Sequence, residues 1–246
     1  MTTPAAVAAR LRTAPAFWNT VLILIPLVTV FTILLGTASL LSGLIDRSGR
    51  LAHGCARMWS RLILLVSRTH VRVEGALPAD GTYVFASNHQ SIYDIPILFW
   101  SIRRQLRIIA KASLGRIPFL GWHLRLAGHL LVDRDHPGPG ILRRMRGLVA
   151  QHASLMVFPE GTRSRDGVVG RFKGGVFLLA IEHQLPIVPV SVRGSRDVML
   201  KDYVTVRPGD VVVTIHPPVS TAGLTRADAR ELAERVRAVV ERGVSC

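Results

Sequence analysis

The chain has 246 residues, enough for one domain with a substantial core and an appended segment, but not for two full domains. Its formal net charge of +15 points to a polyanionic partner, either nucleic acid or an anionic membrane surface. The mean hydropathy of +0.33, and a sequence without a basic run interleaved with aromatics, favour the membrane over nucleic acid.

The first predicted element is an apolar helix near the N-terminus. The run from Thr13 to Ile45 carries no charged side chain, and its centre, VLILIPLVTVFTILLGTASLL, is longer than the ~20 residues that span a bilayer. A secretory signal peptide is the rival, but this apolar region is too long and lacks a small-x-small cleavage site. We therefore expect a membrane-embedded helix, kinked at Pro26 and Gly36.

A second helix is predicted in LAHGCARMWSRLILLVSRTH. This stretch mixes Arg57, Arg61 and Arg68 into an apolar pattern, which suits a helix in the membrane interface. Together the two elements predict a membrane-associated hairpin over residues 1–68, which either spans the bilayer or dips into one leaflet. Arginines after the apolar run outnumber those before it, so the positive-inside rule places residues 69–246 in the cytoplasm.

From about Arg68 onward, short β-rich runs alternate with amphipathic stretches, a pattern typical of an α/β domain. Strands are predicted at His70–Glu74, Thr82–Ala86, Leu106–Ala110, His129–Val132, Ser154–Phe158, Ile187–Val192 and Val211–His216. Helices are predicted at Tyr93–Arg104, Phe119–Ala127, Ile141–His152, Val176–His183 and Arg226–Arg242. Thr225 is the expected N-cap of the last helix.

The stretch FASNHQSIYDIPI, after the second predicted strand, places His89 and Asp94 five positions apart. On a continuous helix they would be rotated by ~140° from each other. Proline is tolerated in a first helical turn but not deeper, so Pro96 predicts a helix that begins near Ile92 or Tyr93. His89 then lies in the loop at the end of a strand, and Asp94 in the first turn can orient the imidazole and raise its basicity. The sequence therefore predicts a general base with its carboxylate.

Other interpretations of this stretch stay open from the residues alone. A capping aspartate beside a surface histidine is about as plausible on spacing. Ser87 or Ser91 could be a nucleophile activated by His89, although no G-x-S-x-G elbow is present to expose it. A metal site has less support, because no other ligand lies at helical spacing from His89, and Cys55 and Cys246 provide neither a cysteine metal site nor a disulfide framework.

The sequence VFPEGTRSRDG predicts a second polar loop beyond a strand end. Pro159 ends the strand pairing, and Gly161 permits a tight turn that displays its neighbours. Arg163 offers a planar fork for a phosphate, and Thr162 and backbone N–H groups can add donors. Glu160 would repel a phosphate, so we expect it to hold a loop arginine or a substrate hydroxyl. A solvated turn with a local ion pair is the plain alternative.

Two nearby features favour an anion site. GRFKGGVFLLA puts Lys173 and a glycine pair at the start of a predicted helix, where an anion is attracted, although the P-loop motif is absent. Lys111 directly follows a predicted strand and is a candidate second phosphate contact.

Four blocks, NHQSIYD, GHLLVDR, FPEGTRSR and LPIVPVSV, occur in this order along the chain. In order and spacing they resemble the four blocks of the glycerolipid acyltransferases, most closely the bacterial 1-acyl-glycerol-3-phosphate acyltransferases. The match covers roughly residues 70–220 and is far more specific than any one block. The N-terminal hairpin also resembles the two-helix membrane motif of bacterial members.

The resemblance implies an α/β fold with a mixed, largely parallel sheet flanked by helices, as in glycerol-3-phosphate acyltransferases, after the N-terminal two-helix segment. It implies that His89 is a general base that deprotonates an acceptor hydroxyl, that Asp94 orients it, and that no acyl-enzyme forms. The glycerol phosphate is implied to bind Glu160, Gly161, Thr162, Arg163, Arg134 and Lys111. Ser113 stands where many members have an acidic residue, which bears only on fine specificity.

The expected activity is acyl transfer from a coenzyme A or acyl-carrier-protein thioester to the sn-2 hydroxyl of lysophosphatidic acid, giving phosphatidic acid. Such a transfer needs no cofactor or metal, only a base, an oriented hydroxyl and donors for the developing oxyanion. The expected place is a bacterial inner membrane, with the catalytic domain on the cytoplasmic face and no nucleic acid as partner. Rivals are an acyltransferase for another lysolipid such as a lyso-ornithine lipid, a serine thioesterase or lipase, and a non-catalytic membrane-binding module.

Overall fold

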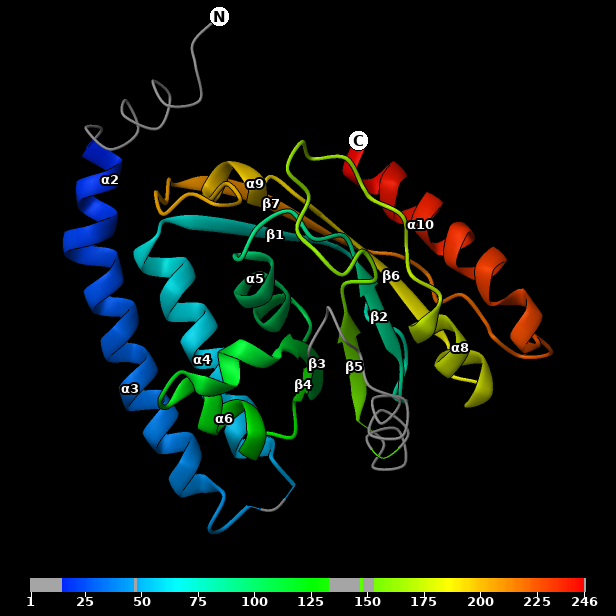
Figure 1. Ribbon diagram of the computed structural model, residues 1–246, viewed down its shortest axis with the longest axis horizontal. Coiled ribbons are helices and arrows are strands. Elements are labelled where there is room, and N and C mark those ends of the chain that lie inside the picture. Colours follow the sequence, from blue (N-terminus) through cyan, green and yellow to red (C-terminus); the bar gives the residue numbers. More distant parts are fainter. Residues whose placement is uncertain (1–14, 47, 133–146, 148–152, 246) are drawn as a thin grey trace, which may run out of the picture.

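A computed structural model describes residues 15–46, 48–132, 147 and 153–245 of the chain (Figure 1). Seven strands form one sheet in the order β1-β7-β6-β2-β5-β3-β4. Neighbouring strands are parallel in every pair except β6 and β7. The predicted α/β fold with a mixed, largely parallel sheet is confirmed.

All seven predicted strands are present, with ends that shift by one or two residues. They are β1 (Thr69–Gly75), β2 (Val84–Ser87), β3 (Leu106–Lys111), β4 (Leu130–Val132), β5 (Ser154–Val157), β6 (Ile187–Arg193) and β7 (Gly209–Ile215). Because β2, β3, β5 and β6 run parallel to one another, their carboxyl ends meet at one edge of the sheet.

Alternate strand residues point to opposite faces of the sheet and build two hydrophobic layers. In β2, Phe85 packs in one layer, whereas Val84 and Ala86 pack in the other. The first layer lies under α4 (Arg50–Val66) and α5 (Asp94–Ser101), and the second under α8 (Gly175–Glu182) and α10 (Ala229–Ser245). Figure 1 shows these two helical layers on opposite sides of the sheet.

The remaining predicted helices mostly occur where expected. α6 spans Leu120–Leu126, and Thr225 precedes a 3₁₀ turn, η3 (Arg226–Asp228), that leads into α10. The Thr225 backbone N–H donates to Asp228 at 2.7 Å, which completes a capping box and confirms the predicted helix start. Two short helical segments were not predicted, η2 (Ala112–Arg116) and α9 (Ser195–Val198). The helix predicted at 141–152 falls almost entirely outside the described residues.

The N-terminal helix runs from Pro15 to Ser42 as α2 (Pro15–Asn19), a π-helical turn η1 (Thr20–Leu24) and α3 (Ile25–Ser42). The π turn comes directly before Pro26, whose ring removes a backbone donor and crowds the preceding turn, so the wider turn is the local adjustment to proline. Gly36, the other expected kink position, lies inside α3, and a Cβ there would be 3.0 Å from the Cβ of Phe119. This glycine allows α3 to approach the start of α6 closely.

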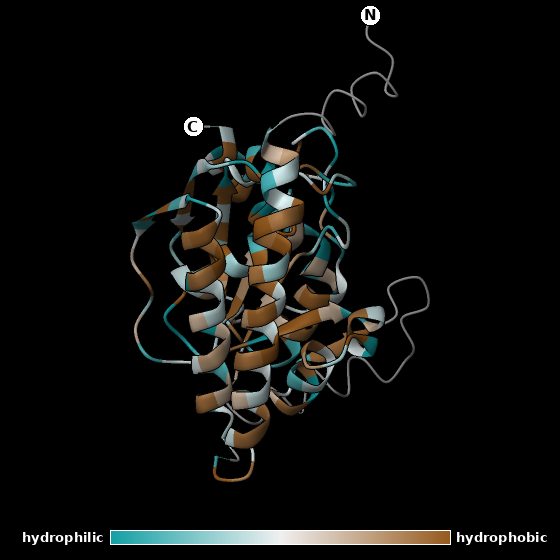
Figure 2. Ribbon diagram, turned by 90° about the vertical axis from the view of Figure 1, so that its left-hand side faces the viewer, coloured by the Kyte–Doolittle hydropathy of each residue, from teal (hydrophilic) through white to brown (hydrophobic). Residues whose placement is uncertain are grey.

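The outer face of this helix is apolar and exposed. The span from Pro15 to Ser42 is long and apolar enough to cross a membrane, and only 11% of its most apolar window is buried. Figure 2 shows hydrophobic residues along most of α3 and mixed hydrophobic and hydrophilic residues along α4. So extended an apolar surface on a helix indicates association with a membrane.

A buried histidine in α6 predicts that the fold loses stability in acid. His123 is 9% exposed, and its Nδ1 lies 2.6 Å from Ser39 Oγ. Burial, aided by the nearby Arg107 guanidinium, lowers the pKa of His123 to about 4. Between pH 6.5 and 4 the unfolded chain therefore binds more protons than the folded chain. The free energy of unfolding should fall as pH drops through this window, by about 3 kcal/mol from this residue.

Urea unfolding of the detergent-solubilised protein at several pH values from 7.5 to 4 measures this effect. His123→Gln keeps a partner for Ser39 without a titrating group and should make the loss of stability less steep, while the buried His53 and His129, whose pKa values burial also lowers, keep the rest of it. His70→Gln, on an exposed position of β1, is the matched control and should leave the pH dependence unchanged. An equally steep loss of stability in the His123→Gln protein would refute the assignment.

Candidate active site

Asn88 determines how the chain leaves the sheet at the end of β2. Its side-chain Nδ2 donates to the carbonyl of Val192 in β6, and its Oδ1 accepts the Val192 N–H, both at 2.8 Å. The side chain thus continues the pairing of β2 with β6 for one more residue while the backbone turns away. His89, the next residue, therefore projects from the carboxyl edge of the sheet, which is the predicted position for a site.

The structure brings His89 and Asp94 together. α5 begins at Asp94, one residue after Tyr93, and Pro96 lies in its first turn. His89 Nδ1 is 2.8 Å from Asp94 Oδ2, and both side chains are buried. The same carboxylate oxygen accepts the backbone N–H groups of Gln90 and Ser91 at 2.7 and 2.9 Å. Asp94 therefore holds the loop and fixes the imidazole with Nδ1 as donor, which leaves Nε2 as the ring nitrogen that can accept a proton.

The second predicted loop, which contains Glu160 and Ser164, hydrogen-bonds to both the N–H and the carbonyl of His89. In the parallel pair β2–β5, Ala86 lies opposite Val157, so His89 and Glu160, each three residues further on, leave the sheet side by side. Glu160 Oε1 accepts the His89 N–H at 2.9 Å, and the Ser164 N–H donates to the His89 carbonyl at 2.7 Å. The two constellations that the sequence placed 70 residues apart form one site.

Phe158 and Glu160 support the histidine ring and its loop. The Phe158 and His89 rings stack with centroids 3.9 Å apart and planes 15° from parallel. Glu160 is 8% exposed, and its Oε2 accepts the Gly170 N–H at 3.1 Å. Burial raises the pKa of Glu160, although the backbone hydrogen bonds from His89 and Gly170 oppose the rise. One carboxylate oxygen thus binds the His89 loop and the other binds Gly170 in the same connection as Glu160, whereas the sequence suggested that Glu160 holds an arginine or a substrate hydroxyl.

The turn that follows displays cationic and hydroxyl groups. Gly161 adopts φ of +75°, as the predicted tight turn requires, and a Cβ there would lie 2.9 Å from the Nζ of Lys173. Thr162 is exposed and Arg163 is half-buried. The Arg163 guanidinium makes no hydrogen bond within the described part of the chain, so it is available to an anionic ligand.

Lys111, another predicted site residue, lies apart from this group. Lys111 ends β3, which is separated from β2 by β5, and its side chain is exposed at the same edge of the sheet. Among the described residues it makes no side-chain hydrogen bond to the His89 or Arg163 loops. Arg134 lies outside the described residues.

The two serines near His89 point their hydroxyl protons at backbone carbonyls. Ser87 Oγ donates to the Asn88 carbonyl at 3.1 Å, and Ser91 Oγ donates to the Met199 carbonyl at 2.7 Å. Both side chains are fully buried. This arrangement disfavours an acyl-serine mechanism, which needs an exposed hydroxyl hydrogen-bonded to the base. In the parts of the chain that the structure describes, no cluster of three or more histidine, cysteine, aspartate or glutamate side chains could hold a metal ion.

An apolar cavity lies beside α5, the helix that begins at Asp94. Ile92, Ile95 and Pro96, which follow His89 closely in the chain, line one part of it. The N-terminal helices contribute Trp59 and Leu35, and η2 and α6 contribute several more apolar residues. The cavity therefore lies between the membrane-associated helices and the helix that carries Asp94, where it suits a hydrocarbon chain.

Comparisons with known proteins agree with this geometry. A family model described as Acyltransferase matches residues 68–193. The 1-acyl-sn-glycerol-3-phosphate acyltransferase of Saccharomyces cerevisiae is 34% identical over 206 residues, covering 81% of this chain and 68% of the relative. A chloroplastic protein of that name from Brassica napus is 35% identical over 195 residues, 76% of this chain and 56% of the relative.

The chain thus spans between about half and two thirds of the length of these curated relatives. Among solved structures, the 1-acyl-sn-glycerophosphate (LPA) acyltransferase PlsC from Thermotoga maritima superposes with a TM-score of 0.75 at 28% identity. That match covers 89% of this chain and 94% of the other. On this match to the family model and to these relatives, the chain belongs to the acyltransferase family.

Proposed function

We propose that the protein transfers an acyl group from a thioester to the sn-2 hydroxyl of 1-acyl-glycerol-3-phosphate, giving phosphatidic acid. The observation that carries this proposal is the direct junction of the His89–Asp94 pair with the Arg163 loop, through Glu160 and Ser164. A base, a phosphate-binding loop and an apolar cavity are the three parts that an amphipathic phosphate-bearing acceptor requires. Relatives named for this activity support the choice of acceptor.

In the proposed mechanism His89 Nε2 removes the proton of the acceptor hydroxyl as that oxygen attacks the thioester carbonyl. Asp94 accepts the Nδ1–H and stabilises the imidazolium that forms. The tetrahedral intermediate then collapses, the carbon–sulfur bond breaks, and the departing sulfur takes the proton from Nε2. The acyl group passes directly to the acceptor, so no acyl-enzyme forms, and the protein needs no cofactor of its own.

Arg163, with Thr162 and the Gly161 turn, is the proposed site for the acceptor phosphate, and Lys111 and Arg134 are proposed as further cations around it. A guanidinium fork matches two phosphate oxygens at once. Glu160 serves this site by holding the loop to the backbone of His89. We place a substrate hydrocarbon chain in the apolar cavity between α3, α4, α5 and α6.

We also propose that residues 1–68 form the membrane-associated hairpin and residues 69–246 the catalytic domain, at the cytoplasmic face of a bacterial inner membrane. The exposed apolar surface of α3 supports this arrangement. A protein attached to the membrane through α3 could bind a lysolipid that stays in the bilayer. A coenzyme A or acyl-carrier-protein thioester would then reach the site from the water.

A panel assay tests the function. The purified protein in detergent micelles receives oleoyl-coenzyme A with lysophosphatidic acid, lysophosphatidylcholine, a lyso-ornithine lipid or no acceptor, and products are identified by mass spectrometry. Phosphatidic acid should form fastest. Faster acylation of the lyso-ornithine lipid would reassign the acceptor, and release of oleate alone would support a thioesterase instead.

A further inference from the structure

The connection between β6 and β7, residues 194–208, contacts both loops of the site. The Met199 carbonyl accepts the hydroxyl of Ser91, which belongs to the His89 loop. On the other loop, the Arg165 carbonyl accepts Arg196 Nη2 at 3.0 Å, and the Arg165 guanidinium lies 3.3 Å from Asp202. Residues 194–208 therefore contact both the loop that carries His89 and the loop of the proposed phosphate site.

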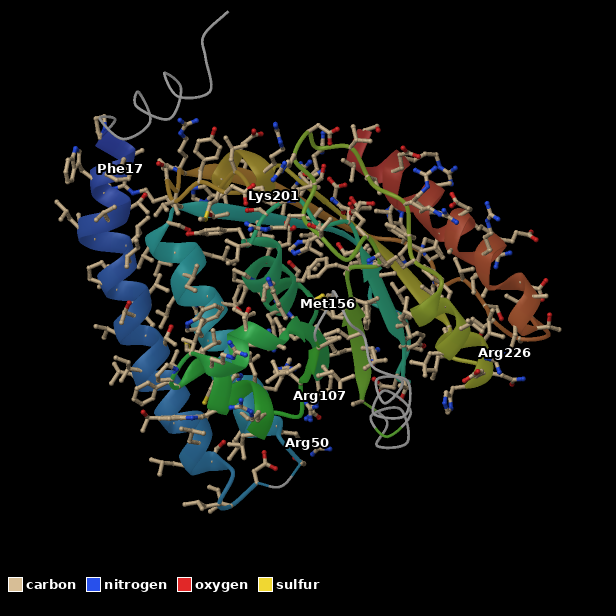
Figure 3. All side chains as sticks on the ribbon, viewed as in Figure 1. Phe17, Arg50, Arg107, Met156, Lys201 and Arg226 are labelled. Carbon is tan, nitrogen blue, oxygen red and sulfur yellow. The ribbon has the colours of Figure 1, made fainter. Side chains whose placement is uncertain are left out.

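Lys201, in the same connection, contacts the Arg163 loop twice. Its Nζ donates to the Arg163 carbonyl at 2.7 Å and to Thr162 Oγ1 at 3.2 Å. The side chain is partly buried. Figure 3 shows Lys201 close to α9. Two of the three ammonium donors are thus bound to consecutive residues of the proposed phosphate loop. Charged donors form hydrogen bonds about twice as strong as neutral ones, so Lys201 holds this part of the loop firmly.

Position 201 is also one of the few basic positions of the chain that carry lysine instead of arginine. Of the 31 basic residues, lysine occurs at three positions only, and arginine fills the rest. A compact ammonium can direct donors to two acceptors on one turn, whereas a planar guanidinium directs its donors in one plane. Lys201 also lies beyond residues 68–193, which match the acyltransferase family model.

We propose that Lys201 is a positioning residue for acceptor recognition. It fixes Thr162 and Arg163 before the substrate arrives, so that the Arg163 guanidinium is preorganised for the phosphate and little entropy is lost on binding. Its positive charge also adds to the field that attracts the anionic acceptor. The identity of the acceptor rests on the proposed function, whereas the ordering of the loop does not.

The kinetic test compares Lys201→Met with the wild type. The KM for lysophosphatidic acid should rise about tenfold, the equivalent of one lost charged hydrogen bond, while kcat and the KM for oleoyl-coenzyme A change by less than about twofold. Lys201→Arg keeps the charge and one donor plane, so it should recover part of the loss. Arg207→Gln, which removes an exposed charge from the same connection, should behave as wild type. An equal rise in both KM values would overturn the proposal.

A substrate-free measurement separates this proposal from the proposed function. Hydrogen–deuterium exchange should quicken in the peptide around Ser164 in Lys201→Met and Lys201→Gln, because the Ser164 N–H is held against the His89 carbonyl by an ordered loop. It should not change in Arg207→Gln. Unchanged exchange in both Lys201 variants would overturn the positioning role even if the protein acylates lysophosphatidic acid. Faster exchange in a protein without that activity would refute only the acceptor assignment.

Discussion

Replacing His89 with alanine is expected to lower kcat for acyl transfer by about 10³-fold, because a positioned general base contributes roughly 10² to 10⁴. The variant keeps Asp94 and the backbone N–H groups bound to it, so the loop should stay folded. Initial rates of coenzyme A release, with phosphatidic acid quantified by mass spectrometry, measure the loss. Vesicle binding should match the wild type, since His89 is buried and is not part of the exposed apolar face of α3.

Three variants serve as controls for this result. His70→Ala removes an exposed histidine from β1 and should leave the rate unchanged. Ser87→Ala and Ser91→Ala should keep most of the turnover, because both hydroxyls bond to backbone carbonyls rather than to His89. Substantial activity in His89→Ala would remove the base from the mechanism. An acyl-serine trapped from wild-type protein during turnover would show that the thioester is attacked by the enzyme and not by the acceptor.

Much of the fold could be predicted because its elements are long enough to carry a periodic pattern. The start of α5 follows from one residue, Pro96, and the start of the last helix from Thr225. η2 and α9, with five and four residues, are too short to show a helical period and were not predicted. The π turn before Pro26 lies in an almost uniformly apolar run, so the hydrophobic pattern could not predict it.

The sequence predicted the His89 loop and the Arg163 loop separately, but not the contacts between them. His89 and Arg163 each follow a strand end, and parallel strands bring such ends together. The contacts of His89 with Phe158 and Glu160 depend on the register of β2 against β5, which the hydrophobic pattern of either strand alone does not give. Lys201 reaches the loop from 38 residues away, through a connection that carries no motif.

Asp94→Asn is expected to lower kcat by about 10²-fold while the site keeps its geometry. An asparagine can place its amide oxygen where Oδ2 lies and still accept the N–H groups of His89, Gln90 and Ser91. Its nitrogen would then occupy the position of Oδ1, which has no hydrogen-bond partner within the described residues. What is lost is the negative charge that stabilises the imidazolium in the transition state. The measurement is kcat for acyl transfer together with the free energy of unfolding in urea.

Asp94→Ala separates charge from geometry. It leaves the Nδ1–H of His89 and two buried backbone N–H groups without an acceptor, at about 1–3 kcal/mol each. We therefore expect this variant to lose several kcal/mol of stability and to be less active than Asp94→Asn. Equal activity of the two variants would show that the negative charge alone accounts for the contribution of Asp94. Wild-type activity in Asp94→Asn would show the opposite, that the carboxylate acts only as an acceptor that holds the His89 loop in place.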